Sequence, residues 1–441
     1  MKPLYIILLI LLKLNANPKP IWINIYIHGT ITPHLSLSDF FKVLNQTQKN
    51  SVYAEITRII RSDPFFHQAQ PIQELNLKKA FPTKSLKGHG ANIFAEFYDK
   101  ISKKISENTP PIHHYTFGWS GLLTIAARRK AAQKLYEQLA RKIKKIEMQN
   151  YEPKIRIIGY SHGGTIALYL AHEAHKNRPL SFMIDELILI SAPIQPETQK
   201  YINSPFFKKI FNFYSNGDRV QASDFLSSIT HSFSHKTFLN SFNFKVPDNV
   251  TQTQIRFLRK HLIIKTNDGS VKKVPRYDYV NPGHTEMFFF GWAAQWYRKH
   301  FPINPLPTAL ILPKLINEIQ KNNLESKHLC ATIIPEDEVI IFKNKKNEEK
   351  INAPFFPKNE LYALQKELVE FRPQNYKIRY KIRVKEAKKN AKKTFQEKLR
   401  RKNLQKKLLR SYQEEILKQL TAATMPTNQP LKVVAPAIQV F

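Results

Sequence analysis

Short apolar runs alternate with longer amphipathic segments over the first three hundred residues of the chain. The apolar runs are rich in β-branched and aromatic residues and end at glycine, proline or polar turn residues, which is typical of buried strands. Between several of them, apolar residues recur every three to four positions, which predicts helices. We therefore expect strands within residues 21–30, 113–121, 154–160, 185–193 and 208–220, and helices over 123–146 and 163–176.

Strands that alternate with helices in this way predict an α/β fold, in which helices cover both faces of a mostly parallel sheet. Residues 32–111 are mixed in pattern and mostly helical, so we expect them to form an insertion or lid over that core. Residues 261–280 predict a hairpin that turns at 267–269. The chain shows no internal repeat.

The character of the chain changes after about residue 307. A proline-spaced, linker-like stretch leads to a strand-like run and then to a basic segment, 372–410, which holds 17 Lys and Arg residues against two acidic ones. Apolar residues recur every three to five positions from Val384 to Leu420, so we expect a long amphipathic helix that docks on the core, pairs with a partner helix or lies on an anionic surface. The predicted organisation is a signal segment at 1–16, an α/β domain at 17–306 and a C-terminal extension at 307–441.

The N-terminus has the pattern of a secretory signal. A short basic start precedes an apolar run from Leu4 to Leu12 and a polar stretch that contains Ala16. The apolar run is too short to span a bilayer comfortably, but it suits a signal segment that is cleaved after Ala16. We therefore expect export to the periplasm, the cell surface or the medium. An uncleaved membrane anchor and a buried first strand are the alternatives.

Net charge bears on the partners of the protein, and the number of cysteines bears on disulfides and metal sites. The formal net charge of the 441 residues is +35, which favours anionic partners such as phosphate backbones, lipid headgroups and acidic polymers. Lys, Asn and Ile are all abundant, so a bias in the coding sequence explains that charge equally well. The single cysteine, Cys330, excludes an internal disulfide and a cysteine-based metal site within one chain.

Residues 159–164, Gly-Tyr-Ser-His-Gly-Gly, form a candidate catalytic motif between a predicted strand and a predicted helix. It fits G-x-S-x-G, in which a serine lies on a strained turn with positive φ and glycines keep other side chains out of the turn. Ser161 is therefore the candidate nucleophile. Half of the chain's 12 glycines fall at loops that such a mechanism uses: Gly29, Gly159, Gly163, Gly164, Gly217 and Gly283.

These residues resemble the α/β-hydrolase superfamily, and within it the lipase- and esterase-like members. The sequence Ile-His-Gly-Thr at 27–30 is similar to the family's oxyanion loop, and residues 159–164 are similar to its nucleophile elbow. Residues 216–218 are similar to its acid turn, and residues 282–284 to its histidine loop. The order serine, aspartate, histidine is also the family's order. The resemblance covers residues 21–302 and leaves the C-terminal third without a counterpart.

The resemblance implies a role for each of these residues. Ser161 is the expected nucleophile, His284 the expected general base and Asp218 the carboxylate that orients the imidazole. The backbone N–H groups of Thr30 and His162 are expected to bind the oxyanion of the tetrahedral intermediate. The resemblance implies neither a metal nor a cofactor.

Other residues compete for these roles. Asp218 stands in a cluster of Asn, Gly and Asp residues, which is also a common turn sequence with no catalytic role. Asp224 is therefore kept as the alternative acid. Among 15 histidines, His284 is favoured because it follows the acid on a loop before an apolar segment, whereas His28 is expected to support the oxyanion loop. His172 and His175 are spaced i, i+3 rather than the i, i+4 of zinc metalloproteases, so we expect a solvated helix face there.

The sequence thus predicts an exported serine hydrolase that cleaves an acyl ester of a lipid or of a small lipophilic alcohol through an acyl-enzyme on Ser161. The basic tail is a candidate for contact with an anionic membrane, while its lack of interleaved aromatic residues argues against nucleic acid. A peptidase or thioesterase with the same three residues is one alternative. A catalytically degenerate scaffold that binds a partner through its basic tail is another. The oligomeric state is left open.

Overall fold

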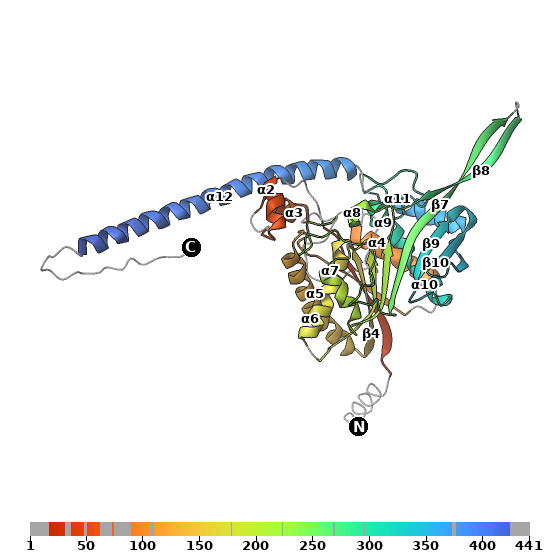
Figure 1. Ribbon diagram of the computed structural model, residues 1–441, viewed down its shortest axis with the longest axis horizontal. Coiled ribbons are helices and arrows are strands. Elements are labelled where there is room, and N and C mark those ends of the chain that lie inside the picture. Colours follow the sequence, from red (N-terminus) through yellow and green to blue (C-terminus); the bar gives the residue numbers. More distant parts are fainter. Residues whose placement is uncertain are drawn as a thin grey trace, which may run out of the picture. The chain divides into compact units, whose positions relative to one another are not determined.

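The structure is a computed structural model with two compact units, residues 1–387 and 388–441 (Figure 1). The predicted signal segment, 1–16, lies outside the described residues, as does part of the segment predicted to form an insertion. The structure describes residues 17–30, 37–47, 51–61, 73–74, 90–105, 110–177, 179–222, 224–267, 270–293, 296–372 and 376–423.

One mostly parallel sheet forms the centre of the first unit (Figure 1). Its strands are β1 (Lys19–Ile27), β2 (Gln73–Glu74), β3 (Ile112–Phe117), β4 (Tyr151–Tyr160), β5 (Ile184–Ile190), β6 (Phe207–Tyr214), β7 (Val250–Asn267), β8 (Ser270–Val280), β9 (His328–Ile334), β10 (Val339–Asn344) and β11 (Lys350–Pro354). Among the described residues their order is β11-β10-β9-β7-β6-β5-β4-β1-β3-β2, with β8 paired to β7. The neighbours from β9 to β3 run parallel, and β2, β8, β10 and β11 pair antiparallel.

Helices connect these strands. They are α2 (Leu37–Leu44), α3 (Val52–Arg61), α4 (Gly90–Ile105), α5 (Ile125–Glu147), α6 (His162–Lys176), α7 (Pro196–Gln199), α8 (Arg219–Ala222), α9 (His284–Phe288), α10 (Leu312–Lys321), α11 (Lys358–Glu370) and α12 (Tyr376–Ala423). The strands and helices predicted from the hydrophobic pattern are all present, and β7 and β8 form the predicted hairpin.

Helices cover both faces of the sheet. In β5, Leu187 and Leu189 belong to an apolar cluster with α5 and α6, whereas Ile188 and Ile190 belong to a second cluster with α4, α10 and α11. Successive side chains of a strand point to opposite faces, so the two clusters lie on opposite sides of the sheet. This confirms the α/β fold class predicted from the sequence.

The segment expected to be an insertion or lid contributes a core helix. α4 buries Ile93, Phe97 and Ile101, which recur every four residues and pack in the cluster on one face of the sheet. α2 and α3 meet through Val43 and Tyr53, both buried, in a small separate cluster. α4 is therefore a layer of the fold rather than a cover over it.

The structure also differs from the predicted domain boundary after residue 306. β9, β10 and β11 follow that point in the sequence and continue the same sheet, with β9 parallel to β7. The stretch that resembled a linker is buried, and Leu310, Ile311 and Leu315 pack in the core. Its prolines interrupt the hydrophobic period without exposing the chain, which explains why the pattern resembled a linker.

The predicted basic helix is confirmed as α12, which is continuous over 48 residues. Every residue from 396 to 421 is exposed. Within the described part of the chain, no helix combines the length and the apolar character that crossing a membrane requires.

Candidate active site

Ser161 lies at the sharp turn between β4 and α6. Its backbone has φ 52° and ψ −128°, a conformation that residues other than glycine rarely adopt. The N–H of Ser161 donates to the carbonyl oxygen of Ile190 at 2.9 Å, and the N–H of Gly164 donates to the carbonyl oxygen of Ser161 at 2.9 Å. Serine at the position just before a helix often caps it, but the Ser161 side chain makes no such hydrogen bond. The hydroxyl is therefore not committed to the helix.

Glycines let α6 approach the sheet closely at this turn. A Cβ atom at Gly163 would collide with the carbonyl oxygen of Ile27 in β1, and one at Gly159 would lie 2.6 Å from Cα of Gly164. Both obstacles are backbone atoms, which cannot move aside as a flexible side chain can. The glycines of the motif are thus required by the packing around Ser161.

Asp218 and His284 form a hydrogen bond between the loops that follow β6 and β8. Nδ1 of His284 lies 2.7 Å from Oδ2 of Asp218, and Oδ1 of Asp218 accepts the N–H of Gln221 at 3.0 Å. The two loops meet at Gly217, where a Cβ atom would lie 2.5 Å from the carbonyl oxygen of Asn281. Any side chain at position 217 would therefore push the aspartate and histidine loops apart.

The surroundings of Asp218 favour its ionised form. Burial opposes ionisation, but the hydrogen bond and the charge of His284, together with the N–H of Gln221, outweigh it and hold the pKa of Asp218 below its usual value. A carboxylate beside Nδ1 of a histidine selects the tautomer in which that nitrogen carries the hydrogen. Nε2 of His284 is then left to accept a proton.

Tyr160 ties the histidine loop to the turn at Ser161. Its hydroxyl donates to the carbonyl oxygen of His284 at 2.9 Å, and the two rings lie 4.9 Å apart between centroids. Because Tyr160 immediately precedes Ser161 in the chain, this contact brings His284 to the serine turn. The structure thus pairs His284 with Asp218 and joins the histidine loop to the residue that precedes Ser161.

Glu286 fixes the start of α9 and was not identified from the sequence. Its buried carboxylate accepts the N–H of Gly283 at 2.8 Å and Nε of Arg298 at 2.8 Å. The hydroxyl of Thr308 donates to the carbonyl oxygen of Glu286 at 3.0 Å. Glutamate three residues after a helix start is the spacing of a capping box, and this signal was present in the sequence.

Gly29 brings the loop after β1 against the serine. A Cβ atom at Gly29 would lie 2.8 Å from Cβ of Ser161, so only glycine fits there. Thr30 follows Gly29 in this loop, and His162 follows Ser161 at the first position of α6. The first N–H groups of a helix have no acceptor within it. Both backbone segments expected to bind an oxyanion therefore adjoin Ser161.

His28 contacts the loop that it is predicted to support. Its Nδ1 lies 2.6 Å from the carbonyl oxygen of Gly29, and Nε1 of Trp119 donates to the carbonyl oxygen of His28 at 2.8 Å. The imidazole and indole rings stack with centroids 5.6 Å apart. These contacts hold the loop that carries Gly29.

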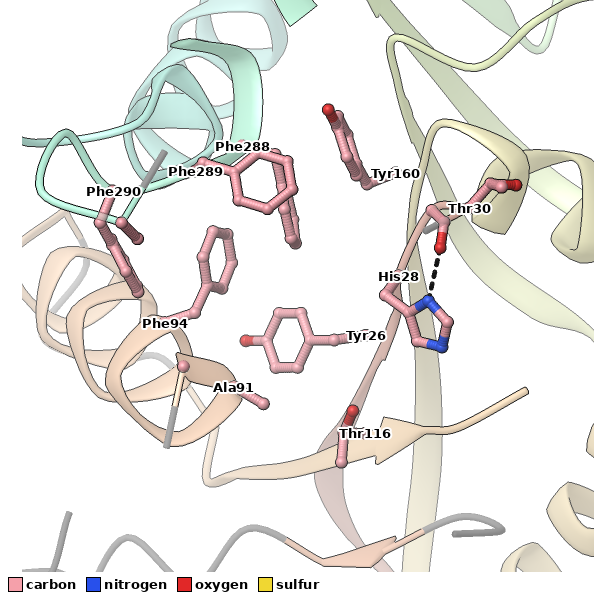
Figure 2. Close-up of a pocket in the computed structure, with 13 residues that line it drawn as sticks. Tyr26, His28, Thr30, Ala91, Phe94, Thr116, Tyr160, Phe288, Phe289 and Phe290 are labelled. Atoms are coloured by element: carbon pink, nitrogen blue, oxygen red, sulfur yellow. Dashed lines mark hydrogen bonds between the residues drawn. The ribbon is translucent and has the colours of Figure 1, made fainter. Parts of the chain in front are cut away.

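An apolar cavity of about 100 Å³ adjoins the same loop (Figure 2). Gly29 and Tyr160, which flank Ser161, are part of its lining. The ring of Phe288 stacks on Tyr160 at 4.5 Å and on Phe94 at 4.8 Å. Apolar cavities of about 150 Å³ take up benzene, so this cavity has room for a small apolar group beside the serine. Its lining residues are Tyr26, His28, Gly29, Thr30, Gly90, Ala91, Phe94, Thr116, Tyr160, Phe288, Phe289, Phe290 and Ala293.

A second histidine–aspartate pair adjoins the serine turn. Nε2 of His162 lies 3.3 Å from Oδ2 of Asp224. The same oxygen accepts Nε2 of Gln195 at 3.0 Å and the hydroxyl of Ser227. The alternative acid of the sequence analysis therefore faces His162, and the carboxylate beside His284 is that of Asp218.

Arg128 supplies a buried positive charge to this second pair. Its fully buried guanidinium donates to the carbonyl oxygen of Ser227. Burial, followed by the charges of Arg128 and His284, lowers the pKa of His162 far below its usual value. Burial also raises the pKa of Asp224, and Arg128 opposes that rise. The side chain of His162 was assigned no role from the sequence, because its partners are far away along the chain.

The remaining candidates lie apart from these contacts. Cys330 is a buried thiol in β9. His175 is exposed in the last turn of α6. In the residues that the structure describes, no group of three or more His, Cys, Asp or Glu side chains is placed to hold a metal ion.

No protein-family model and no curated protein sequence matches this chain. Among solved structures, the chain is similar to phospholipase PlaB from Legionella pneumophila in complex with thio-NAD, with a TM-score of 0.27 and 10% sequence identity. The match covers 76% of this chain and 67% of the phospholipase. A likeness of this size carries no weight in assigning a function, which rests on the site itself.

Proposed function

We propose that the protein is a serine hydrolase that cleaves acyl esters through an acyl-enzyme on Ser161. The observation that carries this proposal is the hydrogen bond between His284 and the buried Asp218, on loops that adjoin the strained turn of Ser161. A serine hydroxyl is a weak nucleophile until a base takes its proton, and a histidine oriented by a carboxylate is such a base.

The proposed reaction has two halves. Nε2 of His284 takes the proton of the Ser161 hydroxyl as its oxygen attacks the ester carbonyl carbon, and Asp218 stabilises the imidazolium. The proton then passes to the alcohol oxygen as the carbon–oxygen bond breaks, which leaves the acyl group on Ser161. Water attacks this acyl-enzyme with His284 again as base, the carboxylic acid leaves, and Ser161 regains its proton.

Backbone N–H groups of Thr30 and His162 are proposed to stabilise the oxyanion in both halves. Each such donor commonly contributes about 3 kcal/mol to lowering the barrier. The low pKa of His162 keeps its ring neutral, so it adds no positive charge that would oppose protonation of His284. The pair of His162 and Asp224 thereby holds the residue whose N–H is proposed to bind the oxyanion, and it adds no positive charge near the base, His284.

The lining of the cavity favours a lipophilic acyl group. Aromatic side chains from several elements line this cavity, as Figure 2 shows for Phe94, Tyr160 and Phe288. We therefore propose an ester of a lipid or of a small lipophilic alcohol as substrate, in preference to a peptide or thioester.

Labelling with a fluorescent fluorophosphonate tests the nucleophile directly. We expect the wild-type protein and Ser181→Ala, which changes an exposed serine, to be labelled, and Ser161→Ala to remain unlabelled. Turnover of p-nitrophenyl esters is expected to follow the same pattern. A folded wild-type protein that takes no label would instead be a binding scaffold that has lost hydrolytic activity.

Export is proposed on the N-terminal pattern alone, with N-terminal membrane anchoring as the alternative. The mass of the protein recovered from the expressing cell and its medium distinguishes the two. Cleavage after Ala16 removes the apolar run, whereas an anchored protein retains it.

A further inference from the structure

The outer part of α12, residues 396–421, is a helix surface exposed to solvent on all sides. Every residue in this range is exposed, and the exposed residues include large apolar side chains. Leu404 is 59% exposed, Leu408 61% and Leu417 66%. Apolar side chains at this density on a water-exposed helix indicate a surface that meets another apolar phase. We call residues 396–421 the outer helix.

Between Leu404 and Ile416, the apolar and basic side chains of the outer helix occupy different arcs of its circumference. Each residue of an α-helix advances about 100°, so Leu404, Leu408, Tyr412 and Ile416 shift by about 40° at each step and spread over roughly 120°. Leu409 falls about 20° beyond that arc by the same count. Lys406, Arg410 and Lys407 project from the remaining circumference, at roughly 200°, 240° and 300° from Leu404. The outer helix is therefore amphipathic over residues 404–416, whereas Arg401, at about 60° from Leu404, and Leu417, at about 220°, lie outside this division.

Its charge is strongly positive. The outer helix holds eight Lys and Arg residues and three Glu residues. Basic side chains beside an apolar face complement a surface that is negative outside and apolar beneath. An anionic phospholipid bilayer has that chemistry.

The spacing of the apolar residues argues against a partner helix. A coiled coil needs alternating steps of three and four residues, so that one narrow seam faces the partner. Here Leu404, Leu408, Tyr412 and Ile416 are each four residues apart and Leu409 lies beyond them, so the apolar positions spread over a broad arc instead of one narrow seam. The resulting broad face suits a flat surface.

We propose that the outer helix binds an anionic phospholipid bilayer and lies in the plane of its headgroups. Its 26 residues extend about 39 Å along the surface. The apolar arc enters the boundary between headgroups and acyl chains, and the basic residues contact lipid phosphates. Spanning the bilayer is excluded for α12 because it is not apolar enough.

This proposal does not depend on the hydrolytic function, and its test separates the two. The full-length Ser161→Ala protein is mixed with vesicles of phosphatidylcholine alone, or of phosphatidylcholine with about one third phosphatidylglycerol, and bound protein is measured by flotation. The Ser161→Ala substitution prevents acyl transfer to the protein, so binding is measured whether or not the wild type is an enzyme. We expect binding to the anionic vesicles at least about tenfold stronger than to the zwitterionic ones, and weaker as salt rises.

Three variants identify the surface. Lys406→Gln/Lys407→Gln/Arg410→Gln removes three charges from the outer helix, and Lys130→Gln/Lys134→Gln/Lys145→Gln removes three exposed charges from α5 as the matched control. Leu404→Gln/Leu408→Gln/Ile416→Gln removes apolar contact and keeps the charge. We expect both outer-helix variants to lose at least about tenfold in vesicle affinity and the α5 variant to retain it. Circular dichroism of each variant verifies that helix content is unchanged.

Two outcomes overturn the proposal. Equal binding to both kinds of vesicle, or equal loss in the α5 variant and the outer-helix variants, leaves no lipid role for this helix. The other outcome is self-association in sedimentation velocity, with no binding to vesicles, that disappears in Leu404→Gln/Leu408→Gln/Ile416→Gln. This result assigns the apolar face to a second copy of the chain instead.

Discussion

Nδ1 of His284 lies 2.7 Å from Oδ2 of Asp218, although 66 residues separate the two in the chain. Each side chain stands on a loop just beyond a strand of the sheet, and Gly217 lets these loops touch at Asn281. The contact therefore depends on the fold as a whole. Replacing the aspartate by asparagine removes the negative charge of this side chain and keeps its shape.

Asp218→Asn is expected to lower kcat for p-nitrophenyl esters about 10⁴-fold, because an amide no longer selects the productive tautomer of His284. Asp224→Asn is the matched control, since it neutralises another buried carboxylate that faces His162 instead. We expect this control to lose about tenfold at most. Equal losses in the two variants would mean that Asp218 has no special role.

Stability is expected to fall as pH drops below about 6.5, the usual pKa of histidine in an unfolded chain. The pKa of His162 in the folded protein is far lower, so between these values the unfolded chain binds a proton that the folded chain does not. This residue contributes a slope of at most about 1.4 kcal/mol per pH unit to the free energy of unfolding.

His162→Gln is expected to flatten this pH dependence, and urea unfolding at several pH values between about 5 and 8 measures it. Some slope should remain, because burial also lowers the pKa of His114. The exposed His175→Gln serves as control and should leave the profile unchanged. An unaltered slope in His162→Gln would show that His162 is protonated as easily in the folded state as in the unfolded one.

Filling the cavity is expected to shorten the acyl chain that the enzyme accepts. Ala91→Phe places a ring in a space of about 100 Å³ beside the serine. We expect kcat/KM for a hexanoate ester to fall at least about tenfold more than for an acetate ester, since loss of each methylene contact in such pockets costs about 1–3 kcal/mol. Ala126→Phe, on the exposed side of α5, controls for the added ring. Parallel losses for both esters would exclude the cavity as the acyl site.

Gly163→Ala is expected to destabilise the protein by about 1–3 kcal/mol in urea unfolding. The new Cβ atom collides with a backbone oxygen of β1, so α6 must shift away from the sheet. Because α6 begins beside Ser161, esterase activity should fall in the same variant. Ser181→Ala is the control. Full stability in Gly163→Ala would mean that the helix has room to move without cost.

Local patterns in the sequence were sufficient for much of this fold and site. The strands that end near Ser161 and Asp218 are predicted by short runs of neighbouring apolar residues. The turns after them are predicted by their glycine and polar residues. The pairing of Asp224 with His162 was not predictable, because no local signal states which of two carboxylates a given histidine will meet. Arg128 was missed for the same reason, since its position on α5 resembles that of the other basic residues around it.

The boundary after residue 306 was misplaced because prolines and a changed composition resemble a linker whether or not the segment is buried. β9 in fact covers the edge of β7. A protein shortened to its first three hundred residues would leave the part of β7 that pairs with β9, Gln252–Phe257, without that partner, and its backbone groups would be open to aggregation. The shortest version suited to crystallisation or surface display is therefore expected to keep β9–β11 and α11 and to end after Ala387, where the first compact unit ends.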